Sequence, residues 1–325
     1  MEFYHDILEN LLDKLIDYRG KTPKKTLSGV PLVTAKIVKN GTINGYTEYI
    51  AEEDYDKWMV RGFPKVGDVI LTTEAPLGEV ALLKEEKVAL AQRIVCLRGK
   101  DNVLDNTYLK YYLQSGKGQK SLSARESGTT VTGIKQAELR RVDIEYPAYD
   151  DQRRIASILS SLDRKIELNN KINADLEEMA QAIFKNWFVD FEPFKDGKFV
   201  DSELGMIPEG WKVGRADDFY QINIGKTPPR KEHKWFSTNP ADKIWVSIAN
   251  MGNSGIFISD SSEYLTKEAV DRHNIIMVPR NTILLSFKLT VGRVAIADKE
   301  LTTNEAIARF ILSDDKYMDY LDLYL

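Results

Sequence analysis

The chain has 325 residues, of which 43% are hydrophobic and 29% are charged, and its formal net charge is −4. These values are those of a soluble globular protein long enough for about two domains, and the mild negative charge argues against a protein that coats nucleic acid indiscriminately. No apolar run reaches the roughly 18 residues of a membrane span, and the acidic N-terminus is unlike a signal peptide. The single cysteine, Cys96, excludes a disulfide framework. We expect a cytoplasmic protein with no membrane partner.

The first half of the chain is typical of a β-rich domain. Short apolar runs alternate there with glycine, proline and charged residues, as strands do. A run with apolar residues at helical spacing follows, and an apolar stretch that ends at a proline predicts the last strand. The strands are predicted at residues 68–73, 78–83, 92–97 and 143–147, and the helix at residues 106–113.

Residues 151–190 contain no glycine and no proline and predict one long helix. About 40 residues at 1.5 Å per residue give a length of roughly 60 Å, and either Asp150 or Asp151 is a candidate N-cap. Apolar residues recur at steps of three and four, so they form a seam that must pair with another helix, as in a coiled coil. The seam consists of Ile155, Ile158, Leu162, Ile166, Asn169, Ile172, Leu176, Met179 and Ile183.

Asn169 interrupts this apolar seam, and two interpretations of it are open. In the first, Asn169 is a weakly packed and exposed position. In the second, it is a buried polar residue that fixes the register against a partner helix at some cost in stability.

The chain changes character again after the helix. An aromatic run at residues 187–191 leads to Pro193, which stops the helix. Residues 194–209 predict a polar linker, and a second domain is expected to open at Gly210.

The sequence repeats itself once, at long range. A period of roughly 210 residues is far too long for a solenoid and predicts two copies of one domain. Two similar domains suit a target with two similar halves, and DNA is such a target. The matching stretches, in the same order and with similar spacing, are 20–23 with 225–228, 69–72 with 283–286, 78–81 with 292–295, and 108–113 with 320–325.

Basic residues gather in three windows without a carboxylate, between Asp17 and Glu48, between Asp271 and Asp298, and at residues 110–125. Such runs are usually solvated surface, but two of the windows occupy related places in the repeat, which favours a shared binding face. Lysine and arginine can neutralise phosphates, and threonine can position or read bases. The candidate DNA-binding residues are Arg19, Lys21, Thr22, Lys24, Lys25, Lys36, Lys39, Lys117, Lys120, Lys226, Thr227, Arg230, Lys231, Lys288 and Arg293.

The sequence contains no recognisable catalytic constellation. The two Gly-Lys-Thr stretches lack the earlier glycine of a phosphate-binding loop, because Leu15 and Tyr220 stand there. Residues 239–242 lack the second proline and the aromatic residue of an amino-methyltransferase loop. The three histidines are too scattered for a zinc site or a catalytic triad. We expect a non-catalytic chain with no metal and no cofactor of its own.

Three stretches resemble the specificity subunits of type I restriction–modification systems. Residues 128–134, running on to Pro147 and to residues 151–159, resemble the junction between a target-recognition domain and the conserved helix of that family. Residues 187–193 and 204–211 match two further motifs, the second at the start of the other recognition domain. The motifs are highly specific, and the resemblance covers nearly the whole chain.

The resemblance implies an α+β fold in which two β-rich target-recognition domains are linked by a long coiled-coil helix. It assigns residues 1–149 to the first domain, 150–193 to the helix and 194–325 to the second. It further implies a non-catalytic subunit that reads a bipartite target in double-stranded DNA, with the helix as spacer and as docking site for methyltransferase subunits. S-adenosylmethionine, ATP and magnesium would then be bound by the methyltransferase and restriction subunits.

The chain departs from this family at its C-terminal end. Leu325 corresponds to Leu113, so we expect the second domain to be incomplete and the second, antiparallel helix of the family to be missing. The seam would then be covered by a methyltransferase subunit or by a second copy of the chain, and we favour the homodimer. Two other functions are open: an enzyme fragment, and a truncated or decoy subunit that sequesters the methyltransferase without productive recognition.

Overall fold

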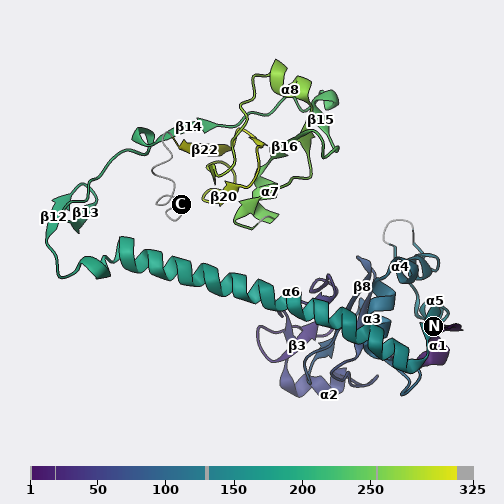
Figure 1. Ribbon diagram of the computed structural model, residues 1–325. Helices are drawn as coiled ribbons and strands as arrows, with labels where there is room; N and C mark the ends of the chain where they lie inside the picture. Colours follow the sequence, from purple (N-terminus) through teal and green to yellow (C-terminus); the bar gives the residue numbers. More distant parts are fainter. Residues whose placement is uncertain (1, 19, 129–131, 254, 313–325) are drawn as a thin grey trace. The chain divides into compact units, whose positions relative to one another are not determined.

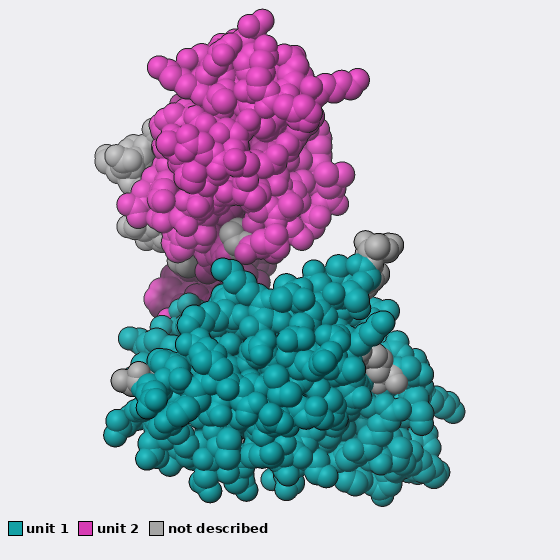
Figure 2. Space-filling model, turned by 90° about the vertical axis from the view of Figure 1, so that its right-hand side faces the viewer, with its two compact units in different colours: residues 1–173 teal, residues 174–325 magenta. Residues whose placement is uncertain are grey.

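The computed structural model of the chain describes residues 2–18, 20–128, 132–253 and 255–312 (Figure 1). It comprises two compact units, Met1–Asn173 and Ala174–Leu325, which Figure 2 colours separately. Each unit has its own sheets and its own apolar core. The boundary between the units falls inside the long helix α6 (Tyr149–Phe184).

The main sheet of the first unit consists of β2 (Leu12–Asp17), β10 (Ile94–Gly99), β7 (Val69–Thr73) and β8 (Leu77–Leu82), in this order and all antiparallel. The last three are the predicted strands. Because side chains alternate between the two faces of a strand, the apolar runs of β7 and β10 are buried on both faces. Cys96 of β10 accordingly lies in the interior.

A second, smaller sheet packs on one face of the main sheet. It consists of β6 (Tyr49–Ile50), β3 (Val30–Val33) and β9 (Ala89–Leu90), with β3 antiparallel to β6 and parallel to β9. Ile16 and Ile70 of the main sheet share one apolar core with these strands. The same layer contains β4 (Val38–Lys39), β5 (Thr42–Ile43), the turn η1 (Glu52–Asp54) and α2 (Tyr55–Trp58).

Helices cover the opposite face of the main sheet. The predicted helix is α3 (Asn106–Gln114), and its N-cap is Asp105, whose carboxylate accepts a hydrogen bond from the N–H of Tyr108 at 2.8 Å. It buries Leu109 and Leu113 against the sheet. The cover is completed by α1 (Leu8–Leu11), α4 (Gly116–Ser123), α5 (Gln136–Arg140) and a two-stranded sheet of β1 (Phe3–Ile7) and β11 (Asp143–Pro147), the last predicted strand.

Helix α6 confirms the predicted long helix. It runs for 36 residues, about 54 Å at 1.5 Å per residue, and continues into the π-helical turn η2 (Lys185–Val189). The prediction that Asp150 or Asp151 is the N-cap is wrong. The carbonyl of Ala148 accepts the N–H groups of Asp151 and Gln152, so the helix begins earlier and both aspartates lie in its first turn. There they still face the positive end of the helix dipole.

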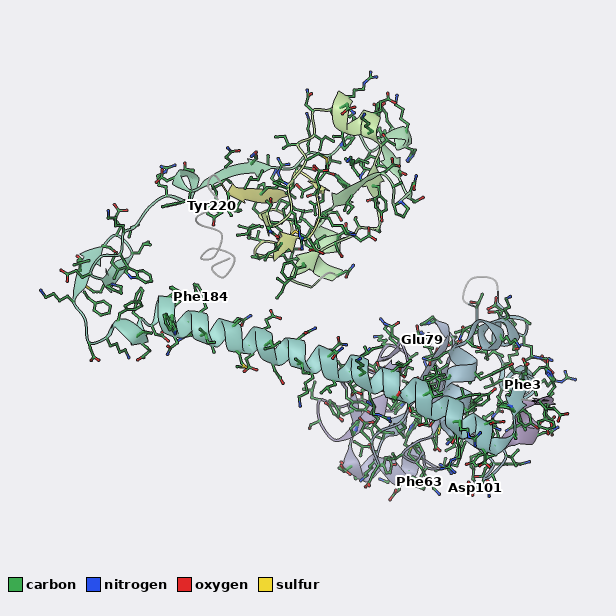
Figure 3. The ribbon with its side chains drawn as sticks, in the orientation of Figure 1. Phe3, Phe63, Glu79, Asp101, Phe184 and Tyr220 are labelled. Carbon is green, nitrogen blue, oxygen red and sulfur yellow. The ribbon has the colours of Figure 1, made fainter. Side chains whose placement is uncertain are left out.

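The prediction of a plain polar linker at residues 194–209 is also wrong. After the turn η3 (Glu192–Phe194), this segment forms an antiparallel hairpin of β12 (Phe199–Ser202) and β13 (Gly205–Pro208). The hairpin forms because aromatic residues before and after it meet and supply an apolar cluster, visible beyond Phe184 in Figure 3. Trp211 has Phe188, Phe191 and Phe194 around it, at ring-centroid distances of 5.9, 5.3 and 5.5 Å.

The main sheet of the second unit consists of β14 (Tyr220–Ile224), β22 (Ile307–Leu312), β19 (Ile283–Ser286), β20 (Val294–Ala297) and β17 (Phe257–Ile258), in this order. Its first four strands are antiparallel and repeat the order β2-β10-β7-β8 of the first unit. The predicted duplication is therefore confirmed in the main sheet.

The smaller sheet of the second unit repeats its counterpart as well. It consists of β15 (Phe236–Ser237), β18 (Tyr264–Leu265), β16 (Lys243–Val246) and β21 (Thr302–Thr303). Strand β16 is antiparallel to β18 and parallel to β21, as β3 is to β6 and β9. The remaining elements are η4 (Ala216–Asp218), η5 (His233–Trp235), α7 (Ile248–Asn253) and α8 (Lys267–Arg272).

Candidate nucleic-acid interface

The Gly-Lys-Thr-Pro stretch of the first unit forms a loop after β2 in which Gly20, Lys21 and Thr22 are exposed and Pro23 is buried. Gly20 has a φ of +81°, which a glycine adopts without steric cost. The Thr22 hydroxyl donates to Oε1 of Gln92 at 2.7 Å, which ties the loop to the segment before β10. Lys21 and Lys24 are exposed on this loop, as a phosphate-binding role requires.

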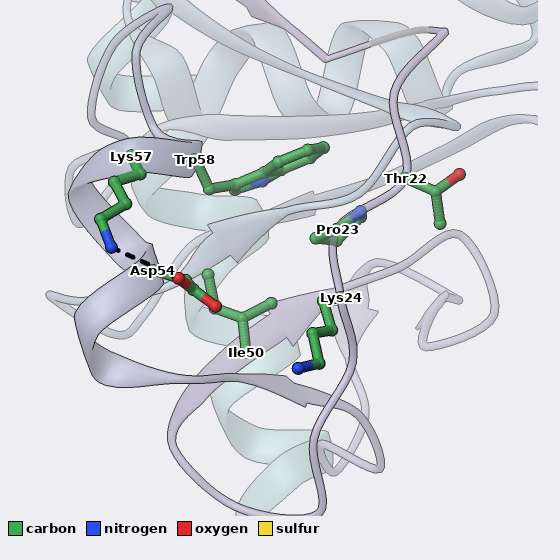
Figure 4. A pocket seen from close by; sticks show the side chains of 7 residues that line it. All are labelled: Thr22, Pro23, Lys24, Ile50, Asp54, Lys57 and Trp58. Carbon is green, nitrogen blue, oxygen red and sulfur yellow. Dashed lines mark ion pairs between the residues drawn. The ribbon is translucent and has the colours of Figure 1, made fainter.

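A pocket of about 240 Å³ lies between this loop and α2 (Figure 4). Trp58 forms one wall; its indole N–H donates to the carbonyl of Leu90 at 3.0 Å, and its ring stacks on Tyr18 at a centroid distance of 5.3 Å. Lys24 faces the pocket from the loop, on the side opposite the aromatic wall. The lining residues are Thr22, Pro23, Lys24, Ile50, Asp54, Lys57 and Trp58.

The other basic candidates of the first unit differ in their partners. Lys25 pairs with Glu48 at 2.8 Å, and Lys117 pairs with Glu145 at 2.6 Å. Arg19 lies outside the described residues. The exposed candidates that form no ion pair with described residues are Lys21, Lys24, Lys36, Lys39 and Lys120.

Most basic candidates of the second unit have a partner within it. Arg230 makes a two-pronged contact with the carboxylate of Glu263, at 2.7 and 3.1 Å. Its guanidinium also lies 4.3 Å from the ring centroid of Phe236 and 4.5 Å from that of Trp245. A guanidinium held by a carboxylate and two rings is less available to a phosphate than a free one.

The Gly-Lys-Thr stretch of the second unit is likewise bound to its own unit. The ammonium of Lys226 donates to the carbonyl of His273 at 2.6 Å, and the Thr227 hydroxyl donates to the carboxylate of Glu305. That hydrogen bond is the main reason why the pKa of Glu305 lies below its ordinary value. Of the candidates in this unit, Lys231 and Lys288 are exposed and pair with no carboxylate of the described residues.

Arg293 is half-buried and braces the second unit. Its guanidinium donates to the carbonyl of Ile248, the first residue of α7, at 2.9 Å. A Cβ atom on Gly252 of the same helix would stand 2.1 Å from the guanidinium, so the glycine makes room for it. The sequence predicts a phosphate contact for Arg293, and its position gives it a structural role in addition.

The N-terminal part of α6 is fixed to the first unit through Gln152, which is fully buried. Its side-chain amide donates to the carbonyls of Val103 and Pro147 at 2.9 and 3.0 Å and accepts the N–H of Asp105 at 2.9 Å. Sequence reasoning missed this residue, because a glutamine in the first turn of a helix usually faces solvent.

Two further contacts hold α6 against the first unit. The Asp163 carboxylate accepts hydrogen bonds from the buried ammonium of Lys110 at 2.6 Å and from the Tyr111 hydroxyl at 2.7 Å. Burial raises the pKa of Asp163, but these two hydrogen bonds and the charges of Lys110 and Lys84 together lower it by more, so that the pKa lies below its ordinary value. One turn later Lys84 pairs with Glu167 at 3.0 Å. The sequence does not predict these contacts, because Lys110 and Asp163 lie 53 residues apart in the chain and Lys84 and Glu167 lie 83 residues apart.

The apolar seam of α6 is exposed beyond its first two turns. Its large apolar residues from Ile158 to Ile183 are 44% to 64% exposed. Ile155 is the exception: it packs against the core of the first unit, so the expectation that the seam has no partner within the chain is wrong for this residue. Asn169 is exposed too.

In the described ranges of the chain, no three His, Cys, Asp or Glu side chains lie together as metal ligands would. No helix within those ranges is both long and apolar enough to cross a membrane.

Comparison with known proteins identifies the class to which this fold and these surfaces belong. The profile of the family described as Type I restriction modification DNA specificity domain matches residues 16–178 and 208–325. The chain therefore belongs to that family, which confirms the resemblance in the three motifs. The two matched segments correspond to the two repeated units, which is consistent with an α+β fold of two β-rich domains joined by a long helix.

Particular relatives are specificity subunits by name. The type I restriction enzyme MjaIX specificity subunit of Methanocaldococcus jannaschii is 34% identical over 223 residues, which cover 66% of this chain and 51% of the relative. The HindI specificity subunit of Haemophilus influenzae is 26% identical over 263 residues, covering 63% and 56%. The chain thus spans about half the length of these relatives.

A solved structure supports the fold. The type I restriction–modification system S subunit from M. genitalium aligns with 99% of this chain and 78% of its own length, at a TM-score of 0.52 and 14% identity. At that identity the likeness is evidence of fold alone.

Proposed function

We propose that the chain is a non-catalytic specificity subunit that reads a bipartite DNA target and directs methylation and cleavage by partner subunits. The observation that carries this proposal is the pair of units with one strand order, placed before and after a 36-residue helix, in a chain of the DNA specificity family. Half-sites on one face of DNA lie about 34 Å apart per helical turn, and a helix of about 54 Å is long enough to span one such interval.

The chemistry belongs, on this proposal, to other chains of the complex. Methyltransferase subunits would bind S-adenosylmethionine, and restriction subunits would bind ATP and magnesium. The sequence supports this division because it lacks the nucleotide- and methyl-donor-binding motifs. Double-stranded DNA in the cytoplasm would be the ligand of this chain, and the exposed part of α6 would dock the methyltransferase subunits.

The candidate DNA-binding residues can be ranked by whether they already form an ion pair with the described residues. A lysine that forms no ion pair with the described residues has no such pair to give up when it binds a phosphate, whereas Arg230 must give up Glu263. We therefore assign the phosphate contacts first to these lysines, namely Lys21, Lys24, Lys36, Lys39 and Lys120 in the first unit and Lys231 and Lys288 in the second.

Sequencing the methylated sites of cells that express the chain with a cognate methyltransferase subunit tests the proposal. We expect one motif in two parts with a fixed spacing. Exchanging residues up to about Pro147 with those of a relative should change one part only. Methylation that does not depend on the chain, or an exchange that changes both parts, would contradict it. A chain that binds the methyltransferase subunit but supports no sequence-specific methylation would be the decoy subunit instead.

We infer that a second copy of the chain can also cover the seam of α6. The apolar residues of the seam are spaced symmetrically about Asn169. Ile166 and Ile172 lie three residues from it, and Leu162 and Leu176 lie seven residues from it. An antiparallel copy with its two-fold axis near Asn169 would bring like residues within about one turn of each other. Burying each of these side chains contributes roughly 1.5–3 kcal/mol.

Sedimentation of the purified chain tests this homodimer. Leu176→Lys places a charge in the seam and should shift the dimer to monomer, while Glu177→Lys, next to it and off the seam, should not. A wild-type chain that sediments as a monomer at micromolar concentration would leave the methyltransferase subunit as the partner of the seam.

A further inference from the structure

Each unit contains a hairpin with the same hydrogen-bonded closure. In the first unit it joins β7 to β8, and in the second it joins β19 to β20. In the first unit the Thr72 hydroxyl accepts the N–H of Glu79 at 2.9 Å, and in the second the Ser286 hydroxyl accepts the N–H of Arg293 at 3.0 Å. The hydroxyl thus closes a loop of the same length in both units. The residue before the N–H donor is a glycine with positive φ in each, +93° and +89°.

Both hairpins place a non-glycine residue in the left-handed region at the tip. Ala75 has a φ of +50° and Leu289 a φ of +63°, and each lies three residues after the hydroxyl. Such a residue is uncommon and costs free energy, so the rest of the loop must impose it. In the second unit the Ser286 hydroxyl also donates to the carbonyl of Thr290 at 2.5 Å. The tip is therefore held in place by its frame.

The side chain of Leu289 points into solvent and is 94% exposed. In the first unit, residues 133 and 134 pair with the hairpin, through Gly133 opposite Glu74 and a hydrogen bond from Ile134 to Thr73, and Ala75 at the tip is exposed all the same. At this tip a large apolar side chain is held outward, where it is available to contact a ligand.

The two hairpins share the closing hydrogen bond, the glycine and the left-handed tip residue, while other residues differ, among them Pro76, which follows Ala75 in the first hairpin through a cis peptide bond. Glu74 of the first unit corresponds to Lys288 of the second, and Glu79 corresponds to Arg293. Glu79 (Figure 3) accepts the N–H of Asn40, so it braces the β4–β5 hairpin as Arg293 braces α7, with the opposite charge. A fixed backbone that carries interchangeable tip residues is the arrangement of binding loops that read different targets.

We propose that Leu289 is a specificity-determining residue that contacts the methyl group of a thymine in the half-site read by the second unit. This inference rests on the proposed function. An apolar side chain can read a thymine methyl in the major groove, and the adjacent Lys288, exposed and without a carboxylate partner among the described residues, can bind a phosphate beside it. The cation next to the leucine favours DNA over a protein surface as the partner of the tip.

The test uses the full chain in complex with its methyltransferase subunit, selected against a pool of random DNA. We expect Leu289→Ala to weaken binding about tenfold, within the range for loss of one base contact, and to abolish a thymine preference at one position of one half-site. The slope of log affinity against log salt should stay the same, because no phosphate contact is lost. Lys288→Ala should do the reverse: it should lower the slope by about one and keep the preference.

Leu289→Gly separates a contact from a folding effect. Glycine relieves the left-handed strain, so this variant should melt no earlier than the wild type and still lose the thymine preference. Ala75→Gly makes the same substitution at the tip of the first unit and should leave the thymine preference in the half-site read by the second unit unchanged. A wild-type complex that selects a motif which Leu289→Gly does not alter overturns the inference alone. A Leu289→Gly variant that loses methyltransferase binding and keeps the motif overturns it as well. A wild-type complex that selects no motif overturns the proposed function.

Discussion

The main sheets of the two units have the same strand order, but one face of the sheet is buried to different degrees in the two units. In the first unit Leu15 of β2 packs against the core under α3, and Leu97 beside it is fully buried. In the second unit the residue of β14 at the same place in the strand pairing is Ile222, and its side chain is 42% exposed. The strand order is the same in both. The pairing of the strands is therefore set by the strands themselves, while the depth of their burial depends on the segments that cover them.

The units also differ in the hydrogen bonds made by the buried polar residue that comes directly before β7 in the first unit and before β19 in the second. Asp68, before β7, accepts two hydrogen bonds from the guanidinium of Arg98, at 2.7 and 2.6 Å. The residue at the same place before β19 is Thr282, whose hydroxyl donates to the carbonyl of Pro279 at 2.8 Å. One unit has a buried ion pair where the other has a neutral hydrogen bond.

The largest expected effect follows from this pair. Asp68→Ala leaves a partly buried guanidinium without its carboxylate and should destabilise the first unit by about 3–5 kcal/mol. Thr282→Val should cost the second unit about 1 kcal/mol, because only a neutral hydrogen bond is lost. Hydrogen exchange of the amides of β7 and β19 measures each unit separately. Equal losses in the two variants would show that the ion pair adds nothing beyond a hydrogen bond.

The repeated glycines should respond differently to the same substitution. A Cβ atom on Gly225 would stand 2.0 Å from the backbone oxygen of Asn304, whereas one on Gly20 would meet nothing within 4 Å. Gly225→Ala should therefore cost about 3 kcal/mol from overpacking against backbone. Gly20→Ala should cost about 1–2 kcal/mol, from its positive φ alone. Denaturant unfolding of the two variants checks the order, and a larger loss for Gly20→Ala would refute it.

The contact of Asp163 with Lys110 and Tyr111 should make the docking of α6 dependent on pH. The pKa of Asp163 is lowered in the folded chain, so its contribution is fully present above the ordinary aspartate value of about 3.9 and is lost as the pH falls through the lower, folded value. Asp163→Asn should remove this dependence and cost about 1 kcal/mol at neutral pH, since the carboxylate is half-exposed. Amide exchange of residues 157–167 at several pH values measures it; the same acid sensitivity in the variant would point to another group.

The smallest effect is expected from single phosphate contacts. Lys24→Ala should lower the log–log salt slope of DNA binding by about one and weaken binding to all sequences alike. Lys25→Ala should change it less, because Lys25 is paired with Glu48. Fluorescence titration of the assembled complex over a range of salt concentrations gives both slopes. If both lysines can be removed with affinity and slope unchanged, the loop at residues 20–25 is not a DNA contact.

The candidate surfaces were less predictable than the fold. Basic windows identify where positive charge gathers along the chain, but Arg230 is held by Glu263, 33 residues away, and Arg293 by a carbonyl 45 residues away. The aromatic residues on both sides of residues 194–209 were visible in the sequence, yet only their meeting around Trp211 turns that segment into a hairpin. The tip residue Leu289 went unnoticed because a left-handed backbone conformation has no signature in a leucine.

The sequence by itself determined the duplication, the strands of the main sheet, the helix α3 and the long α6 with its seam. The duplication follows from matching stretches about 210 residues apart, and the strands and helices follow from local periodicity, which is set by the geometry of each element and can be read within a few turns or a few residues. Only the tertiary structure decided which lysines remain free, that Gln152 and Asp163 anchor α6, and that Ile155 belongs to the core of the first unit. Ion pairs and hydrogen bonds depend on distances in space, and partners that are 50 residues apart become neighbours only when the sheets and helices have packed.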